Sequence, residues 1–405
     1  MTLADDPEIP SALPLLEEIR RRMAARTDRH DEWSILETLL GATAEELDFL
    51  ARRLDLGALL GDMDDRWIGP QNRTALLELL TGDRLEHLGI RARAAVVAAL
   101  QRGRTGAAAE RSIRRVLLGT RGAALTALKN ALDSGSDHRD LHQLVYDDID
   151  SREVREEILA HFAAEAAPCG EVKILSDIDD TFYANWKDRR YPAKTIYPGV
   201  LQLYAELDRG PGEQPGRPGD LTFVTARPGD RLGLIEGATR AALGERGVVA
   251  MSVLTGSFRR LLTNRAIAEK KLENFLEYRR LYPEYGFVFI GDSGQGDVHF
   301  GQRMRELAPE VVRGIFIHDV VATPDAARRE LASGGVLLFD TYVGAAADAL
   351  ALGLIHPEGA ARVAQAARSE LAAITFPSPA HRDAREAEIA RDIDRLRALL
   401  PTGSP

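Results

Sequence analysis

Two aspartates separated by one residue stand at the end of an apolar run in this sequence. Residues 172–181 read VKILSDIDDT, so Asp177 and Asp179 come after a stretch with strand character. At a junction between a strand and a loop, this spacing lets both carboxylates turn toward one point. Taken alone, the tract also fits an acidic turn that caps the next element, and residues further along the chain decide between the two.

Polar residues of complementary chemistry end other apolar runs. Thr225 ends the run within FVTARP, and Asp292 ends the run GFVFIGD, with Asp297 shortly after it. In open parallel sheets, ligands bind outside the carboxyl ends of the strands. We therefore expect these side chains to meet at one site.

The residue types at this expected site suit phosphate chemistry. Converging carboxylates repel one another unless a hard cation neutralises them, and Mg²⁺ is the usual partner of such oxygens. A hydroxyl and an ammonium, the latter from Lys270 or Lys271 in the helical stretch 268–278, suit a phosphoryl group beside the metal. One carboxylate can attack phosphorus and form an aspartyl-phosphate, while its neighbour handles the proton. The predicted reaction is hydrolysis of a phosphate ester.

The elements that must position these residues alternate between strand and helix. Apolar runs separated by helical stretches predict a parallel sheet with helices on both faces. The runs lie at residues 172–175, 221–224, 248–254, 287–290 and 313–317, and a sixth run at 336–339 is expected to extend the sheet. The fold class expected for residues 171–345 is therefore α/β with a Rossmann-like parallel sheet, followed by helices at 346–405 that pack on it.

The N-terminal part has a different sequence pattern. Residues 14–167 are helical in pattern throughout, with a capping box from Thr43 to Glu46, and residues 1–13 are expected to be disordered. The stretch AEAAPCG at 164–170 breaks the pattern and marks a domain boundary. An all-α domain precedes the sheet, and its default role is interaction or regulation.

A second Asp-x-Asp in this part is interpreted as a helix cap. Asp148 and Asp150 lie in YDDIDS, directly before the amphipathic stretch REVREEILAHF. Either Asp150 or Ser151 is the expected N-cap, with Glu153 completing a box from Asp150. The spacing is that of the first tract, but no phosphate or metal partner accompanies it.

Composition bounds the class of protein. The chain has 405 residues, enough for two or three domains, and a net charge of -10 that argues against broad adhesion to nucleic acid. The single cysteine, Cys169, excludes an internal disulfide and fits a reducing cytoplasm. The first residues lack a secretory pattern, and no apolar run approaches the roughly 18 residues that span a bilayer. We expect a cytoplasmic protein that reaches any lipid from the membrane surface.

Four segments together resemble a known family. DIDDT, FVTARP, KKLENFLEYRRLYP and GFVFIGDSGQGD are similar to the motifs of haloacid dehalogenase (HAD) superfamily phosphatases. More narrowly, the double Asp in DIDDT, the YPGV tract, GDSGQ and RGIFIHDV resemble the phosphatidate phosphatase catalytic domain of the actin-patch-protein type, a relative of the lipins. The resemblance covers about residues 172–321 and leaves the helical part outside.

The resemblance implies roles for individual residues. Asp177 would be the nucleophile and Asp179 the general acid/base, with the Asp179 carbonyl also on the metal. Thr225 would bind the phosphoryl group. Lys271 would stabilise its charge and hold the nucleophile; it is preferred to Lys270 because it precedes a helix that ends in Tyr-Pro, as the family's lysine does.

The same resemblance implies an Mg²⁺ site. Asp177, Asp179, Asp292 and Asp297 would be its ligands, Asp297 directly or through water. One departure concerns the second motif: the close family has a Ser-Asn tract there, whereas FVTARP is nearer the lipin form. Specificity carried over from either group stays open.

The short insertion after the first motif bears on the size of the substrate. About forty residues separate Thr181 from the second strand, which leaves little room for a lid and favours a bulky substrate such as a lipid or a phosphoprotein. Within it, FYANWKDRRYPAK interleaves basic and aromatic residues, which suits an anionic membrane interface or, alternatively, a solvated hairpin with its aromatics packed beneath.

The best prediction for the substrate is phosphatidate, hydrolysed to diacylglycerol and phosphate by an Mg²⁺-dependent phosphatase. Two alternatives stay open. One is a phosphatase of a soluble phosphoester or phosphoprotein, and the other is an adaptor or effector whose helical part binds a protein partner.

Overall fold

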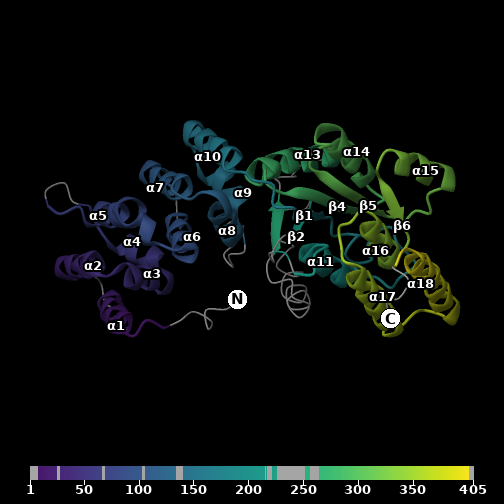
Figure 1. The fold of residues 1–405 in the computed structure, drawn as a ribbon, viewed down its shortest axis with the longest axis horizontal. Helices are drawn as coiled ribbons and strands as arrows, with labels where there is room; N and C mark the ends of the chain where they lie inside the picture. The colour runs from purple at the N-terminus through teal and green to yellow at the C-terminus, as the bar shows by residue number, and fades with distance from the viewer. Residues whose placement is uncertain are drawn as a thin grey trace. The chain divides into compact units, whose positions relative to one another are not determined.

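The computed structural model describes residues 8–24, 28–65, 69–102, 105–133, 140–214, 216, 221–225, 251–255 and 264–400. For Thr225, 251–255 and 264–267 only the course of the backbone is described. The chain divides into two compact units, Met1–Ala167 with Arg280–Tyr282 and Pro168–Arg279 with Pro283–Pro405 (Figure 1).

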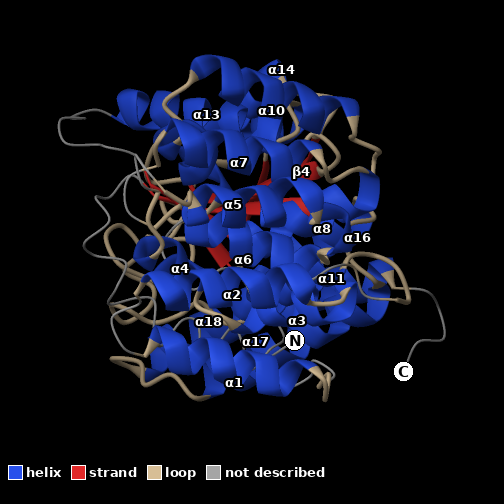
Figure 2. Ribbon diagram, turned by 90° about the vertical axis from the view of Figure 1, so that its left-hand side faces the viewer, coloured by secondary structure: helices blue, strands red, loops and turns tan. Residues whose placement is uncertain are grey.

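The described part of the N-terminal unit is built from helices, shown blue in Figure 2. These are α1 (Ala12–Met23), α2 (Arg29–Gly41), α3 (Ala44–Arg53), α4 (Leu56–Asp62), α5 (Asn72–Glu78), α6 (Ile90–Leu100), α7 (Ala107–Leu118), α8 (Gly122–Asp133), α9 (Leu141–Gln143) and α10 (Arg152–Ala164), with π-helical turns at Leu79–Asp83 and Leu144–Asp148 and a 3₁₀ turn at Leu85–His87. Helix α1 begins slightly before the expected residue 14. Of the segment expected to be disordered, residues 1–7 lie outside the described residues.

Two local predictions in this unit can be compared with the helix ends. The capping box of α3 is confirmed: the Glu46 amide donates to Thr43 Oγ1 at 3.3 Å, and the Thr43 amide donates to Glu46 Oε2 at 2.9 Å. Helix α10 is capped by Ser151, whose Oγ accepts from the Val154 amide at 3.3 Å. The alternative box from Asp150 is wrong, because the helix begins one residue later and the Asp150 amide donates to the carboxylate of Glu110.

The second unit contains the sheet. Its strands are β1 (Val172–Ser176), β2 (Leu221–Thr225), β3 (Met251–Thr255), β4 (Gly286–Asp292), β5 (Val312–His318) and β6 (Leu337–Phe339). Its described helices are α11 (Val200–Arg209), α13 (Asn264–Leu281), α14 (Asp297–Leu307), α15 (Asp325–Ser333), α16 (Tyr342–Ala351), α17 (Pro357–Ala372) and α18 (Pro379–Leu399).

All described strands are parallel, in the order β3-β2-β1-β4-β5-β6. This is the order of the Rossmann fold, so the predicted α/β class is confirmed, including the sixth strand. The structure thus joins an all-helical N-terminal region to an α/β sheet.

Side-chain alternation along β4 explains why helices cover both faces. Phe289 points to one face, where its ring lies 4.7 Å from that of Phe300 on α14. Val288 and Ile290 point to the other face and join the core formed with α11, α16, α17 and α18. Figure 1 shows α13 and α14 on one side of the sheet and these other helices on the opposite side. A strand buried on both faces reads as a continuous apolar run, as FVFI does here.

The C-terminal helices belong to the core of the sheet. Helix α16 spans residue 346, the expected start of the C-terminal segment. Val363 of α17 and Ile389 and Ile393 of α18 lie in the same buried cluster as strand residues. Removing these helices would expose one face of the sheet to water.

The sheet order fixes where a site can form. The connections leave β1 toward β2 on one side, and the chain returns to β4 on the other, so a crevice opens at the carboxyl ends of β1 and β4. Ser176 pairs in register with Ile290, which brings the residues after β1 level with the end of β4. Asp177 and Asp292 are therefore neighbours.

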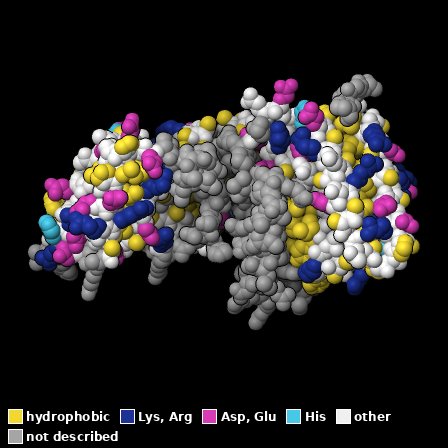
Figure 3. Space-filling model, turned by 90° about the horizontal axis from the view of Figure 1, so that it is seen from below, with side chains coloured by type: hydrophobic (Ala, Val, Ile, Leu, Met, Phe, Trp, Pro, Cys, Tyr) yellow, Lys and Arg dark blue, Asp and Glu magenta, His cyan; other side chains and the backbone are white. Residues whose placement is uncertain are grey.

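The surface shows mixed charge. On the face seen in Figure 3, lysine and arginine side chains are interspersed with aspartate and glutamate among the described residues. Within the part of the chain that the structure describes, no helix combines the length and the apolar character that a bilayer crossing requires.

Candidate active site

Three buried carboxylates meet at the carboxyl ends of β1 and β4. Asp177 comes directly after β1, Asp292 ends β4, and Asp297 opens α14. One oxygen of each lies within 4.8 Å of the others, and each residue is at most 7% exposed. The structure thus brings together three of the four predicted metal ligands, and we call this group the carboxylate cluster.

Among the described residues, one ammonium group faces the carboxylate cluster. Lys271 Nζ, on α13, donates to Asp177 Oδ1 at 2.8 Å and to Asp297 Oδ1 at 2.6 Å. Lys270 points elsewhere and pairs with the exposed Glu273 at 2.9 Å. Of the two candidate lysines, Lys271 is the one that lies at the site.

Burial and the neighbouring charges shift the pKa values in the cluster. Burial raises the pKa of Asp177 to about 7, with Asp297 and Asp179 adding to the effect and Lys271 opposing it. Burial, then Asp297 and Asp177, hold the pKa of Asp292 well above its usual range. Burial disfavours the charge of Lys271, but the two carboxylates outweigh it and raise its pKa. One ammonium does not balance three carboxylates, so the cluster would gain from a cation.

Glycine at position 291 allows the acids to come this close. A Cβ on Gly291 would lie 2.6 Å from Asp297 Oδ2, so only glycine leaves room for that carboxylate against the strand. The Gly294 amide donates to Asp292 Oδ1 at 2.7 Å, and the Asp292 amide donates to Asp297 Oδ2 at 3.3 Å. The GDSGQGD sequence therefore forms a tight turn that presents two carboxylates together.

Asp179 lies beside the cluster and contributes no side-chain oxygen to it. It is half-buried, and its Oδ1 accepts a hydrogen bond from Asn185 Nδ2 at 2.6 Å. Its charge still reaches Asp177, whose pKa it helps to raise. Sequence reasoning missed Asn185, since nothing in FYANWK marks this residue as a partner of the first motif.

Thr225 is placed by its backbone alone. It is the last residue of β2, and the pairing of Ser176 with Phe223 sets it past the end of β1, at the carboxyl edge of the sheet. Its side chain, and the Ala-Arg-Pro that completes the motif, lie outside the described residues.

Asp180 holds the loop after the first motif, a role that the sequence did not indicate. Its carboxylate is fully buried and accepts hydrogen bonds from the backbone amides of Asn185 at 2.8 Å, Trp186 at 3.1 Å and Lys187 at 2.7 Å. Its own backbone is left-handed, with φ of 55°. The partners are backbone amides, which every residue except proline offers, so no sequence signal could have identified them.

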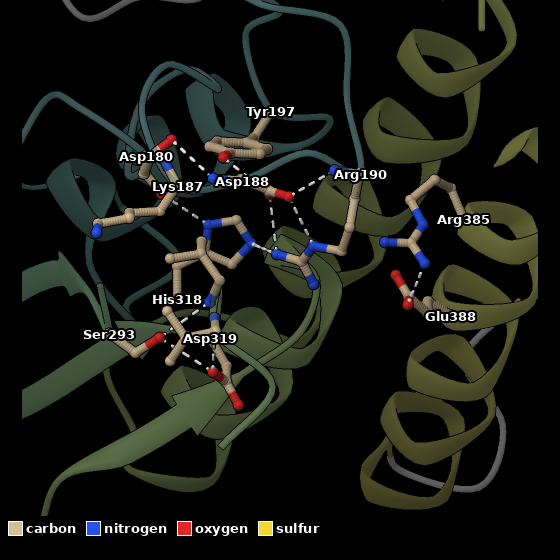
Figure 4. Close-up of polar contacts among 12 residues, drawn as sticks. Asp180, Lys187, Asp188, Arg190, Tyr197, Ser293, His318, Asp319, Arg385 and Glu388 are labelled. Atoms are coloured by element: carbon tan, nitrogen blue, oxygen red, sulfur yellow. Dashed lines mark hydrogen bonds and ion pairs between the residues drawn. The ribbon is translucent and has the colours of Figure 1, made fainter. Parts of the chain in front are cut away.

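His318 connects this loop to the end of β5 (Figure 4). Its Nδ1 lies 2.9 Å from the Asp180 carbonyl, which can only accept, and its Nε2 lies 3.1 Å from Arg190 Nη2, which can only donate. The ring is therefore neutral, with the proton on Nδ1. Burial, helped by Arg190, lowers the pKa of His318 to about 4. Its position opposite Asp292 in the strand register is a signal that could have marked it.

Arg190 continues the same chain of contacts. It binds both oxygens of Asp188, each at 2.9 Å, and the Tyr197 hydroxyl donates to Asp188 Oδ2 at 2.9 Å. Burial opposes the charge of Asp188, but the Arg190 guanidinium outweighs it and lowers the pKa of that carboxyl. These contacts tie the insertion to the body of the unit.

The aromatic residues of the insertion behave differently from one another. Tyr183 and Tyr191 are buried, and the ammonium of Lys194 lies 4.4 Å from the centre of the Tyr183 ring. Trp186 is 60% exposed, next to Lys187. The two tyrosines are thus buried under the segment, as the hairpin alternative predicts, whereas Trp186 and Lys187 are exposed to solvent.

Comparison with known proteins agrees with this geometry. Residues 172–319 match the family model described as phosphatidate phosphatase APP1, catalytic domain. The match confirms, for this segment, the resemblance seen in the four motifs, and it includes all the residues placed at the carboxylate cluster. No curated protein and no solved structure matches the chain.

Proposed function

We propose that the second unit is an Mg²⁺-dependent phosphatase that hydrolyses a phosphate monoester through an aspartyl-phosphate, with phosphatidate as substrate. The observation that carries the proposal is the buried contact of Lys271 with Asp177 and Asp297, beside Asp292, at the crevice of a parallel sheet. The match of residues 172–319 to a phosphatidate phosphatase catalytic domain supports the same chemistry.

Asp177 is the proposed nucleophile. Its carboxylate would attack phosphorus, forming a phospho-aspartate and releasing the alcohol of the ester. The ionised carboxylate is the reactive form, and Lys271 at 2.8 Å favours it against burial. The same ammonium fixes the carboxylate's orientation and offers positive charge to the phosphoryl oxygens as negative charge redistributes.

Asp179 is the proposed general acid and base. Its half-buried carboxylate is held by Asn185 outside the carboxylate cluster, so it can face the leaving oxygen without being bound to a cation. It would give a proton to the departing alcohol and then take one from the water that hydrolyses the phospho-aspartate. Thr225, at the carboxyl edge of β2, would donate its hydroxyl to the phosphoryl group.

The donor set fits Mg²⁺. The buried carboxylate oxygens of Asp177, Asp292 and Asp297 are hard ligands of the kind that this ion prefers. The Asp179 carbonyl would join them, as the family resemblance implies. When bound, the ion supplies charge neutralisation to the cluster and to the phosphoryl oxygens. Burial, and after it repulsion between the carboxylates, raises the pKa values of Asp177 and Asp292, and a bound cation would favour their charged forms.

A lipid substrate suits the surroundings of the site. The exposed Trp186 and Lys187 sit on the loop that Asp180 anchors directly after the first motif. An exposed aromatic ring and an ammonium on this loop suit a bilayer surface that carries phosphatidate. We propose a cytoplasmic protein that works at the membrane surface.

A substrate panel tests this proposal. Purified protein with Mg²⁺ is incubated with phosphatidate vesicles and, separately, with soluble phosphoesters and phosphopeptides. Release of phosphate from the vesicles is expected. Release only from soluble esters or phosphopeptides would show that the substrate is a soluble phosphoester or a phosphoprotein and not a lipid.

A partner-binding role is proposed for the N-terminal helical domain, residues 14–167. Trp33 and Leu40 lie two turns apart on α2, on one face, and are 52% and 50% exposed. Large apolar side chains in such positions are typical of a protein interface. Replacing both residues by charged ones should abolish the binding of partner proteins without changing phosphate release. Unchanged binding would show that this surface is not the interface.

A further inference from the structure

A pocket of about 350 Å³ lies between the insertion after the first motif and the beginning of α18. Its lining contains three arginines, one histidine and two alanines: Arg189, Arg190, Ala380, His381, Ala384 and Arg385. None of these belongs to the carboxylate cluster. The pocket is a separate, basic feature of the second unit.

Arg385 contributes a buried hydrogen-bond donor to the lining of the pocket. The residue is only 8% exposed, and its Nη2 pairs with Glu388 Oε1 at 2.6 Å. Its Nη1 is buried and has no hydrogen-bond partner among the described residues, and the same holds for Oε2 of Glu388. A buried guanidinium N–H without an acceptor is unfavourable. In Figure 4 the Arg385 guanidinium extends toward that of Arg190, and an anion between them would give Arg385 Nη1 an acceptor.

The charge around the pocket is positive after its internal pairs are counted. Asp188 neutralises Arg190 and Glu388 neutralises Arg385. Arg189 is exposed and forms no ion pair with any residue that the structure describes, so its charge is available.

The N-terminus of α18 adds to this positive charge. Its first turn lines the pocket, and a long helix carries partial positive charge at that end. His381 also lines the pocket, and its Nδ1 lies 2.8 Å from Ser378 Oγ.

We propose that this pocket is a second anion site, which binds the phosphate group of a phosphomonoester outside the catalytic centre. Guanidinium groups present paired donors that match phosphate oxygens, and two or more converging on one point favour a group with several oxygens. The volume leaves room for the moiety that carries the phosphate, against Ala380 and Ala384. The phosphate can belong to a soluble ester or to a lipid headgroup.

The position of Arg190 gives the site a route to the catalytic loop. Arg190 lines the pocket and also binds Asp188 and the ring of His318, which in turn contacts the Asp180 carbonyl. An anion that binds Arg190 therefore changes the contacts of Arg190 with Asp188 and His318, which hold the loop beside Asp179.

Titration calorimetry of the full chain with inorganic phosphate, in the presence of a metal chelator, tests the proposal. Without metal the carboxylate cluster repels anions, whereas the pocket keeps its charge. Arg189→Gln is expected to weaken phosphate binding about tenfold, which corresponds to about 1.4 kcal/mol. Arg385→Gln should weaken phosphate binding further. If Arg385→Gln fails to fold, Arg189→Gln alone still tests the proposal.

Two controls complete the experiment. Arg397→Gln changes an exposed arginine at the far end of α18 and should bind phosphate as the unmodified protein does. Lys271→Met changes the catalytic site and should also retain binding. Absence of phosphate binding, or binding that Lys271→Met removes and Arg189→Gln leaves unchanged, would overturn the proposal.

Vesicles distinguish the two sources of phosphate. Phosphatidylcholine vesicles with and without phosphatidylinositol monophosphate are compared with free inositol monophosphate, again in chelator. Tighter Arg189-dependent binding to the phosphoinositide vesicles would assign the site to a lipid headgroup, and equal or tighter binding of the free ester would assign it to a soluble ligand. Because no turnover is measured, failure of the phosphatase proposal would leave this result intact.

Discussion

The ammonium of Lys271 lies 2.8 Å from the carboxylate of Asp177, with both side chains buried and with the Asp297 carboxylate 2.6 Å from the same ammonium. A buried ion pair contributes little net stability when it is complete, but removing one partner leaves a buried charge without its counterion. A single substitution of Lys271 or Asp177 should therefore lower the stability of the protein more than a substitution at a neighbouring exposed position does.

The two adjacent lysines provide a matched pair of variants. Lys271→Met should lower the free energy of unfolding of the metal-free protein by about 3 kcal/mol and reduce phosphate release by about 10² or more. Lys270→Met removes an exposed pair with Glu273 and should stay within about 0.5 kcal/mol of the unmodified protein. Urea unfolding and a phosphate assay measure both effects; equal behaviour of the two variants would contradict the assignment.

Metal binding and proton transfer are separable through Asp292 and Asp179. Addition of Mg²⁺ should raise the melting temperature, because the ion binds the folded state. Asp292→Asn should lose most of this rise. Asp179→Asn should keep it, since the side chain lies outside the cluster, yet lower kcat by about 10²–10⁴. Differential scanning fluorimetry with and without Mg²⁺ measures the first effect, and loss of the rise in Asp179→Asn would place that side chain on the metal.

Asp180 should control the order of the loop that carries Trp186. Its carboxylate accepts several backbone amides, and Asp180→Asn replaces a charged acceptor by a neutral one with half the acceptor oxygens. Hydrogen exchange of the amides of Asn185, Trp186 and Lys187 should accelerate, with a loss of about 2 kcal/mol of stability. Unchanged exchange at these amides would show that the loop is held by other contacts.

His318 should make the fold sensitive to mild acid. Its pKa is lowered from 6.5 to about 4 in the folded protein, so the unfolded state binds the proton more readily. Stability is therefore full above about pH 6.5 and falls as the pH drops toward 4, by about 3 kcal/mol in all. His318→Gln, which cannot titrate, should show a smaller fall between pH 7 and pH 4.5 in urea unfolding. An identical fall in both proteins would assign the acid sensitivity to other groups.

The strands and the residues at their ends could be predicted from the sequence, for one physical reason. A strand of a parallel sheet is buried on both faces, so it reads as an apolar run, and the polar residue that ends it is conspicuous. Asp177 and Asp292 stand out in this way, and their meeting results from the parallel order of β1 and β4. Context also separates this site from the tract at Asp148 and Asp150.

Contacts between side chains and distant backbone could not be predicted. Asp180 binds amides of its own loop, and His318 reaches the Asp180 carbonyl from a strand far along the chain. Backbone groups carry no sequence information, so these partners leave no pattern. The preference for Lys271 over Lys270 came from the family resemblance alone, because a run of two lysines does not specify how α13 is rotated against the sheet.

Phosphate release from phosphatidate vesicles with Mg²⁺, measured side by side for the unmodified protein, Asp177→Asn and Asp150→Asn, tests the central claim most directly. Asp150 carries the same spacing without the partners, so Asp150→Asn should release phosphate at the unmodified rate. Asp177→Asn should release none above the background. Turnover by Asp177→Asn, or an unmodified protein that releases no phosphate from the vesicles, would contradict the account.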